Sequence, residues 1–299
     1  MLSQELQQLL EVVPKNFADP SADYLAVRAM FGPFHGHPVP DDLQITINEL
    51  GGVRVGHYSN PQTAGVQRTV FHCHGGAFVS CPLDVYHFYA EMIMRLTHSK
   101  VVVPDYRLAP EHPYPAASDD CFNAYRGLLE SGVDPQTIYF FGESCGGSLA
   151  VGTLLRARDA GLPMPRGFVS LTGWFDLTVA DTSLITDIKG NSRDPFLTPA
   201  WVRNRTTEYL AGAIAPKNPL VSPAYADLTG LPPMYLQIGQ YDTVREGALK
   251  LAANAVRDGV AVTMESWPEM IHGWQGLANM QVPEALAAWK KIREYLDKN

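Results

Sequence analysis

The stretch "IYFFGESCGGSLA" (Ile138–Ala150) joins an apolar, aromatic run to a small-residue segment of helical character. Its centre, Gly142 to Gly146, fits the pattern G-x-S-x-G with Ser144 as the serine. A strand, this pentapeptide and a helix in succession predict a tight turn that projects the Ser144 hydroxyl above a sheet. Glycine suits both ends of the pentapeptide because side chains there would collide across the turn, and because glycine adopts backbone angles that other residues resist. The sequence therefore predicts Ser144 as a nucleophile.

The segments on either side of this turn alternate between short apolar runs and longer helix-like stretches. This alternation predicts an α/β fold with a largely parallel sheet flanked by helices. The predicted central strands are 66–73, 100–106, 137–143, 167–173, 233–239 and 261–267, and two earlier runs, 43–50 and 52–59, are expected to form an opening, antiparallel pair. The predicted helices between them are Val85–Thr97, Ala117–Leu129, Gly147–Ala160, Arg245–Arg257 and Val282–Leu296.

One interval, from about Asp176 to Ser222, interrupts the alternation. It has polar turns and one aromatic, helix-like piece, "TPAWVRNRTTEYL". Connections between core elements usually span only ~4–6 residues, so this interval is an insertion. We predict a catalytic domain of residues 41–175 and 221–299, with a small helical cap formed by residues 1–40 and 176–220. A surface insertion without function is the alternative.

Composition restricts the class of protein. The chain has 299 residues, 46% of them hydrophobic and 18% charged, which indicates a globular protein with a large core. Its formal net charge of −8, without a cluster of basic residues, argues against nucleic acid as a partner. The four cysteines form no C-x-x-C pair and suit a reducing compartment. The first residues lack the basic start of a signal peptide, and no apolar stretch reaches ~18 residues, so we predict a cytoplasmic protein without a membrane span.

A serine hydroxyl is a weak nucleophile and needs a base and an orienting acid. With this type of turn the chain order is Ser, then Asp or Glu, then His. His272, in "MIHGW" after the last predicted strand, is the only histidine of nine that follows Ser144, and we predict it as the base. Asp176 and Asp242 both lie at the carboxyl end of a predicted strand. Asp242 is favoured because Asp176 leads into the insertion, where a turn or a helix cap is a natural role.

A tetrahedral intermediate also needs hydrogen-bond donors for its oxyanion. The run "FHCHGGAF" places Gly75 and Gly76 directly after an apolar strand. Glycines let backbone N–H groups approach a reacting oxygen, and the residue after the nucleophile supplies a second source. We predict the oxyanion donors at Gly75, Gly76 and the backbone of Cys145. An ordinary turn is the alternative for the two glycines alone.

Five motifs in this order resemble those of the hormone-sensitive lipase-like esterases of the α/β-hydrolase superfamily: "HGGAF", "DYRLAPEHPYPAA", "GESCGGSLA", "GQYDTVREGALKLA" and "MIHGW". They extend from about His74 to Trp274, most of the chain. The pentapeptide alone is weakly specific, whereas the ordered set is highly specific. The resemblance implies an α/β-hydrolase fold with a helical cap. It also implies a carboxylesterase that acts on small-molecule esters with short to medium acyl chains and uses no cofactor.

The resemblance also assigns the site. Its nucleophile, acid and base fall on Ser144, Asp242 and His272, which decides between the two acids, and its oxyanion glycines fall on Gly75 and Gly76. Members of this family often dimerise, so a homodimer is an expectation from the resemblance alone.

Three positions depart from the commonest family pattern. Glu143 stands where Asp is usual, Cys145 where Ala is usual and Ala77 where Gly is frequent. Ala77 is not expected to donate to the oxyanion, so activity should survive. The thiol of Cys145 lies beside the nucleophile, but neighbouring side chains point apart and a buried cysteine usually behaves as a small hydrophobe.

Other conspicuous residues have weaker assignments. Trp174 and Phe175, at the start of the insertion, are predicted to wall the acyl pocket, with ordinary core packing as an equal alternative. His72 and His74 face the same way on a strand, but no third ligand is evident, so no metal site is predicted.

Three functions remain after the sequence has been considered. The first is ester hydrolysis through an acyl-enzyme. The second keeps the same three residues but acts as an acyltransferase or amidase. The third is a non-catalytic binding protein on the same fold, which is disfavoured because no member of the predicted triad is missing.

Overall fold

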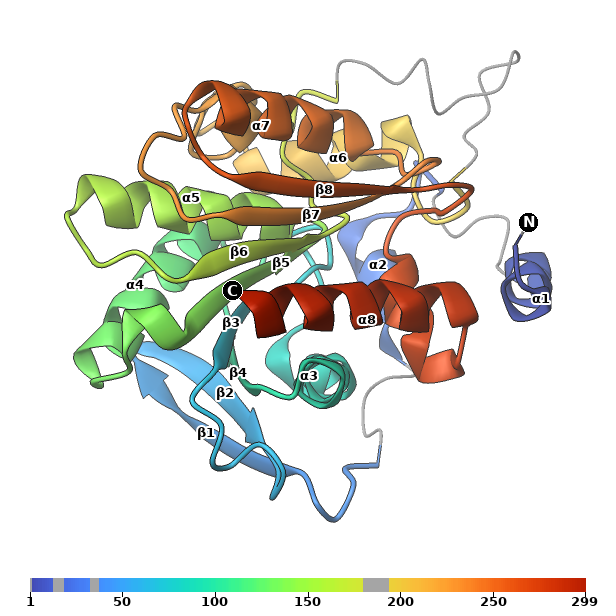
Figure 1. The fold of residues 1–299 in the computed structure, drawn as a ribbon. Coiled ribbons are helices and arrows are strands. Elements are labelled where there is room, and N and C mark those ends of the chain that lie inside the picture. The colour runs from blue at the N-terminus through green and yellow to red at the C-terminus, as the bar shows by residue number, and fades with distance from the viewer. Residues whose placement is uncertain (1, 13–18, 33–37, 180–193) are drawn as a thin grey trace.

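The computed structural model describes residues 2–12, 19–32, 38–179 and 194–299 of the chain (Figure 1). Within them the strands are β1 Gln44–Leu50, β2 Val53–Ser59, β3 Thr69–Cys73, β4 Lys100–Pro104, β5 Ile138–Glu143, β6 Gly167–Leu171, β7 Met234–Gly239 and β8 Val262–Trp267. The α-helices are α1 Gln4–Val12, α2 Tyr24–Met30, α3 Leu83–Thr97, α4 Ala116–Glu130, α5 Gly146–Asp159, α6 Pro199–Leu210, α7 Arg245–Arg257 and α8 Pro283–Lys298. The strands and helices predicted from the sequence are all present, with bounds that differ by only a few residues. One position is wrong: the run 261–267, predicted as a central strand, is the edge strand β8, and it is only partly buried because no strand of the described residues covers its outer side.

The strands of the described residues form one sheet in the order β1-β2-β4-β3-β5-β6-β7-β8. Strand β2 pairs antiparallel with β1 and β4, and the other neighbours pair parallel. The predicted antiparallel opening pair and the mostly parallel sheet are therefore confirmed. Because parallel strands end at the same edge, the segments that follow β3, β5, β7 and β8 meet there.

Helices cover both faces of the sheet (Figure 1). On β5, Phe140 packs with α4 and α5, whereas Tyr139 and Phe141 belong to the core beneath α3 and α8. Alternate residues of a strand face opposite sides of the sheet, so an apolar run without polar interruption fits a strand that is buried on both faces. This explains why the central strands appear in the sequence as continuous apolar segments.

Two pieces of the predicted cap lie together at the carboxyl edge. Helix α6 begins at Pro199, with the Thr198 side chain accepting from the Trp201 N–H as an N-cap. It is joined to the segment before α2, where Asn204 donates to the Pro20 carbonyl at 2.6 Å and Arg205 donates to the Ala22 carbonyl at 3.0 Å.

Helix α1 docks elsewhere. The Ser3 hydroxyl donates to Glu284 at the start of α8 at 2.7 Å, and Leu6 is buried in the core beneath that helix. Residues 13–18, 33–37 and 180–193 of the predicted cap lie outside the described residues. The division into catalytic domain and cap stays a prediction.

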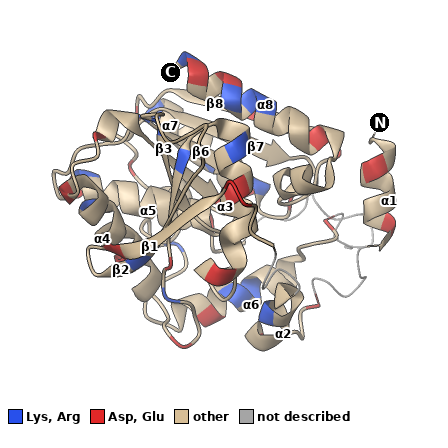
Figure 2. Cartoon of the chain, turned by 90° about the horizontal axis from the view of Figure 1, so that it is seen from below, with Lys and Arg blue, Asp and Glu red and all other residues tan. Residues whose placement is uncertain are grey.

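The visible charged residues are interspersed. Figure 2 shows acidic and basic positions side by side along α8 and scattered over the rest of this face. Among the described residues, no helix combines the length and the apolar character that crossing a bilayer requires.

Candidate active site

The turn between β5 and α5 holds Ser144 in a strained backbone conformation. Its φ is +53°, in the left-handed region that residues with a side chain seldom adopt. Three backbone hydrogen bonds fix the turn: the Ser144 N–H donates to the Leu171 carbonyl, and the Ser144 carbonyl accepts from Gly147 and Trp174, the last at 2.7 Å. Strain of this kind persists only where the surroundings over-determine it, and it is concentrated at functional sites.

The two glycines of the pentapeptide are required by space. A Cβ at Gly142 would lie 2.7 Å from the Gly147 Cα. A Cβ at Gly146 would lie 2.0 Å from the Cys73 carbonyl oxygen at the end of β3. The collision across the turn expected from the sequence is therefore real, and strand β3 adds a second one.

Ser144, His272 and Asp242 form one hydrogen-bonded chain. The distance from His272 Nε2 to Ser144 Oγ is 2.8 Å, and that from His272 Nδ1 to Asp242 Oδ1 is also 2.8 Å. Asp242 follows β7 and is fully buried, whereas Ser144 and His272 keep 9% and 8% of their surface exposed. A reactant can therefore reach the Ser144 hydroxyl, while the Asp242 carboxylate behind the imidazole is excluded from solvent.

Asp176, the other acid considered from the sequence, has different partners. Its carboxylate accepts from Lys250 and Tyr225, both at 2.7 Å, and from the Thr178 hydroxyl at 2.5 Å. It is tied to α7 and to the start of the insertion, and it makes no hydrogen bond to His272.

The electrostatics favour a charged imidazole. Burial, the largest single effect, lowers the pKa of His272. The charge and hydrogen bond of Asp242 and the charges of Asp194 and Glu143 raise it, and together they outweigh burial. The result is a pKa of about 9. Because the positive form is stabilised, this imidazole is a strong acceptor for a proton from Ser144.

The predicted oxyanion residues differ in what they bond; Gly76 lies in the wall of the pocket that contains Ser144, and Cys145 follows Ser144 in the chain. The Gly75 N–H donates to Glu143 Oε2 at 3.0 Å. The backbone N–H groups of Gly76 and Cys145 donate to no acceptor in the part of the chain that the structure describes. Gly76 has a φ of +104°, and a Cβ there would lie 2.5 Å from the Ser80 carbonyl oxygen. Only glycine fits this position.

Glu143 gains a structural role that its sequence position did not indicate. Its Oε2 accepts from the Tyr86 hydroxyl at 2.6 Å as well as from the Gly75 N–H. Burial raises the pKa of this carboxyl, and the two hydrogen bonds act in the opposite direction. The side chain thus joins the end of β5 to the glycine loop after β3 and to α3.

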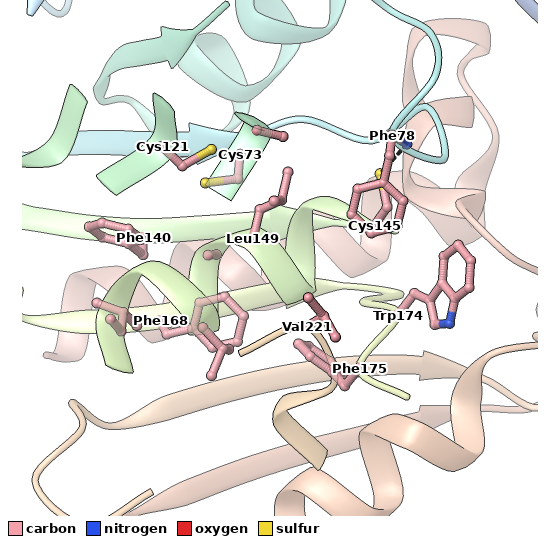
Figure 3. Close-up of a cluster of buried hydrophobic side chains, with 14 of the residues drawn as sticks. Cys73, Phe78, Cys121, Phe140, Cys145, Leu149, Phe168, Trp174, Phe175 and Val221 are labelled. Carbon is pink, nitrogen blue, oxygen red and sulfur yellow. Dashed lines mark hydrogen bonds between the residues drawn. The ribbon is translucent and has the colours of Figure 1, made fainter. Parts of the chain in front are cut away.

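The thiol of Cys145 faces the core, away from the Ser144 hydroxyl. Cys145 is fully buried, and its Sγ accepts from the Phe78 N–H at 3.2 Å (Figure 3). Burial raises the pKa of the thiol to about 12, against the effect of that hydrogen bond. It is a neutral, packed group, as expected for a small hydrophobe.

A chamber of about 200 Å³ opens beside Ser144 and His272. We call it the Ser144 chamber; its other lining residues are Val27, Met30, Phe31, Gly76, Ala77, Glu143, Trp174, Phe196, Leu197, Trp201, Val202, Gly273 and Leu277. A neighbouring chamber of about 500 Å³ shares Phe31, Gly76, Glu143 and Leu277 with it and extends towards Tyr86, Phe88, Tyr89 and Met280. Both chambers are therefore mainly apolar and meet at the glycine loop.

The two aromatic residues at the start of the insertion lie in different environments. Trp174 lines the Ser144 chamber. Phe175 does not; it is buried in the core with Phe168 and Val221, so core packing, the alternative considered from the sequence, describes it (Figure 3). The walls contributed by α2 and α6 belong to the two segments predicted as a cap, but no helix was predicted at α2, and the sequence did not show which of their residues line the chamber.

A second carboxylate, Asp194, was also missed from the sequence. Among the described residues, one group of side chains brings potential metal ligands within 4.8 Å of one another: Asp194, Asp242 and His272. Both ring nitrogens of His272 already take part in the hydrogen-bonded chain. A cation could reach this imidazole only by breaking that chain.

Comparisons with known proteins bear on the fold and the family of this chain. The family model described as "alpha/beta hydrolase fold" matches residues 70–276. An acetyl-hydrolase of Streptomyces hygroscopicus is 38% identical over 207 residues, covering 69% of this chain and 68% of that protein. An esterase of Acinetobacter venetianus is 33% identical over 258 residues, covering 86% and 83%. The crystal structure of an esterase from the bacterial hormone-sensitive lipase family matches with a TM-score of 0.90 at 33% identity, covering 100% of this chain and 99% of that one.

Proposed function

The chain belongs to the α/β-hydrolase family, as a carboxylesterase of the bacterial hormone-sensitive lipase group, and from this premise we propose that Ser144, His272 and Asp242 are its catalytic triad. The observation that carries the proposal is the unbroken chain of 2.8 Å contacts from the strained serine through the imidazole to the buried carboxylate.

In the first half-reaction, Ser144 Oγ attacks the acyl carbon of the ester while His272 Nε2 takes the hydroxyl proton. The same imidazole then gives this proton to the leaving alcohol, and an acyl-enzyme remains. In the second half-reaction a water molecule attacks the acyl carbon while His272 Nε2 takes its proton. The bond between the acyl carbon and Ser144 Oγ then breaks, the imidazolium returns the proton to Oγ, and the carboxylic acid is released. Asp242 holds the Nδ1–H tautomer and stabilises the imidazolium in both steps.

The oxyanion of each tetrahedral intermediate needs donors that are not already engaged. Gly76 and Cys145 offer such N–H groups, whereas the N–H of Gly75 is directed at Glu143. We assign donation to Gly76 and Cys145, and we give Gly75 the role of holding the loop in place through Glu143.

A serine-directed reagent tests the nucleophile. Phenylmethanesulfonyl fluoride should sulfonylate the wild-type enzyme once, on the peptide that contains Ser144, and activity should fall in step with the modification. Mass spectrometry of the digested protein identifies the site. Full inactivation with the label on a different peptide would contradict the assignment.

The acyl preference is proposed to be for short chains. The Ser144 chamber has a volume of only about 200 Å³, and one of the relatives is named an acetyl-hydrolase. A series of 4-nitrophenyl esters from acetate to palmitate should show the highest kcat/KM among the short acyl chains. A maximum at the long chains would show that the acyl group occupies a different space, such as the larger neighbouring chamber.

The pH dependence follows from the raised pKa of His272. The base acts in its neutral form, so activity is lost as pH falls below the pKa of the free enzyme. With that pKa at about 9, kcat/KM should still be rising with pH above 7, where an unperturbed histidine is already mostly neutral. Rates measured by pH-stat titration check this. A plateau that begins near pH 7 would mean that Asp242 does not raise the basicity of the imidazole.

The oligomeric state of the protein and its location in the cell are proposals that rest on the sequence. The predicted homodimer can be tested by light scattering coupled to size-exclusion chromatography. The cytoplasmic location can be tested by fractionation of the native cells.

A further inference from the structure

Asp194 is buried at the point where the insertion returns towards α6. Only 2% of its surface is exposed. One oxygen, Oδ1, accepts from the N–H groups of Phe196 and Leu197 at 3.0 and 3.3 Å. The other, Oδ2, accepts from the N–H of Thr243 at 3.1 Å. Three backbone donors therefore fix the direction of this carboxylate.

The carboxylate lies next to the proposed acid and base. Potential ligand atoms of Asp194, Asp242 and His272 all lie within 4.8 Å of one another. Asp242 Oδ1 bonds His272 and the Val244 N–H, while its Oδ2, also buried, has no hydrogen-bond partner among the described residues. A buried carboxylate with one unsatisfied oxygen depends on its neighbours to keep its orientation.

The backbone around Thr243 connects the two acids. Thr243 follows Asp242 directly; its N–H donates to Asp194, and its hydroxyl donates to the Leu197 carbonyl at 3.0 Å. Phe196 and Leu197, between Asp194 and α6, line the Ser144 chamber. The same few hydrogen bonds thus hold the loop of the acid and a wall of the chamber.

We propose that Asp194 is a positioning residue, whose buried negative charge beside the Asp242–His272 pair stabilises the imidazolium and whose backbone contacts fix the loop that carries Asp242. This inference rests on the proposed function, because it assigns Asp194 a role only through that pair.

The three carboxyl groups whose charges act on the His272 imidazole come from three different elements of the fold. Asp242 comes from the loop after β7, Asp194 from the insertion, and Glu143 from the end of β5. Burial raises the pKa of Asp194 to about 7, with the charge of His272 acting against this and that of Asp242 adding to it. Asp194 is therefore ionised on the alkaline side of neutrality, where His272 needs an opposite charge as it takes the Ser144 proton.

The test is the Asp194→Asn variant, assayed with 4-nitrophenyl butyrate by pH-stat titration. Asparagine keeps an acceptor for the Phe196 and Leu197 N–H groups but removes the charge and, with it, the acceptor of the Thr243 N–H. We expect kcat to fall roughly tenfold with little change in KM, and the acid limb of kcat/KM to move down by about one pH unit, since an opposite charge at this distance shifts a pKa by roughly 1–3 units. An acid limb identical to that of the wild type would overturn the inference.

Thr243→Val is the matched control. It removes the hydroxyl contact to Leu197 but keeps the N–H that bonds Asp194, so the charge stays in place. Any loosening of the loop can lower its kcat, but the acid limb should stay where the wild type has it. An equal shift in both variants would assign the effect to loop packing and refute the role of the charge.

Two further measurements distinguish a folding defect, a failure of the proposed function and a failure of this inference. If Asp194→Asn does not fold, as judged by circular dichroism, Asp194→Ser removes the charge with a smaller polar group and carries the same expected shift. The wild type and Ser144→Ala are assayed alongside. An inactive wild type would remove the proposed function itself, whereas an active wild type with an unshifted Asp194 variant would remove only this inference.

Discussion

Ser144→Ala should lower kcat for 4-nitrophenyl butyrate by about 10⁵–10⁶-fold, the loss seen when the nucleophile of a serine triad is removed. Without Oγ no acyl-enzyme can form, and the rate that remains comes from the oxyanion donors and from substrate binding. The variant should fold normally, because alanine and serine are nearly equal in size and the turn is held by backbone hydrogen bonds that do not involve the hydroxyl. Initial rates at saturating ester give the comparison.

Ser131→Ala is the control for this loss. Ser131 follows α4 near the start of β5, whereas Ser144 lies at the carboxyl end of that strand. Among the described residues the Ser131 hydroxyl donates to the Leu128 carbonyl alone. Its activity should equal that of the wild type. If Ser144→Ala retained more than a few per cent of activity, a different group would have to form the acyl-enzyme.

The features that could be predicted from the sequence depend on local sterics and chain order. The turn at Ser144 was predictable because glycine is required at Gly142 and Gly146 whatever the surroundings, and the collisions found there confirm that reason. The strands β3 to β7 were predictable from continuous apolar runs that fit strands buried on both faces. His272 was predictable because no other histidine follows the serine.

Other features depend on contacts between distant segments, which no local pattern encodes. The Asp194–Thr243 hydrogen bond joins residues 49 positions apart, and nothing in "SRDPF" distinguishes this aspartate from one that begins a turn. The engagement of the Gly75 N–H depends on the reach of the Glu143 side chain, which is one methylene longer than the usual aspartate. The separation of Trp174 from Phe175 likewise depends on how the chain leaves β6.

The assignment of the acid is open to a direct experiment with two matched variants. Asp242→Asn should lower kcat by about 10⁴-fold while leaving the fold intact, because the amide can donate to Nδ1 and stabilise the wrong tautomer of His272. In that tautomer Nε2 carries a proton and cannot accept one from Ser144. The pH profile of Asp242→Asn is measured together with its kcat. If hydroxide can replace the imidazole as the base, the loss of kcat relative to the wild type should become smaller at high pH.

Asp176→Asn makes the same chemical change at the other acid that the sequence allowed. Asp176 pairs with Lys250, whose side chain is 42% exposed, but the Asp176 side chain is only 9% exposed and also accepts from Tyr225 and Thr178, so losing this charge should cost about 1–3 kcal/mol of unfolding free energy. Its kcat should stay within about twofold of the wild type because its partners are Lys250, Tyr225 and Thr178 rather than the imidazole. Denaturant melts and rates measured on the same preparations separate the two effects. If Asp176→Asn lost the activity and Asp242→Asn kept it, the 2.8 Å contact between Asp242 and His272 would be structural, and the base would have to take its orientation from elsewhere.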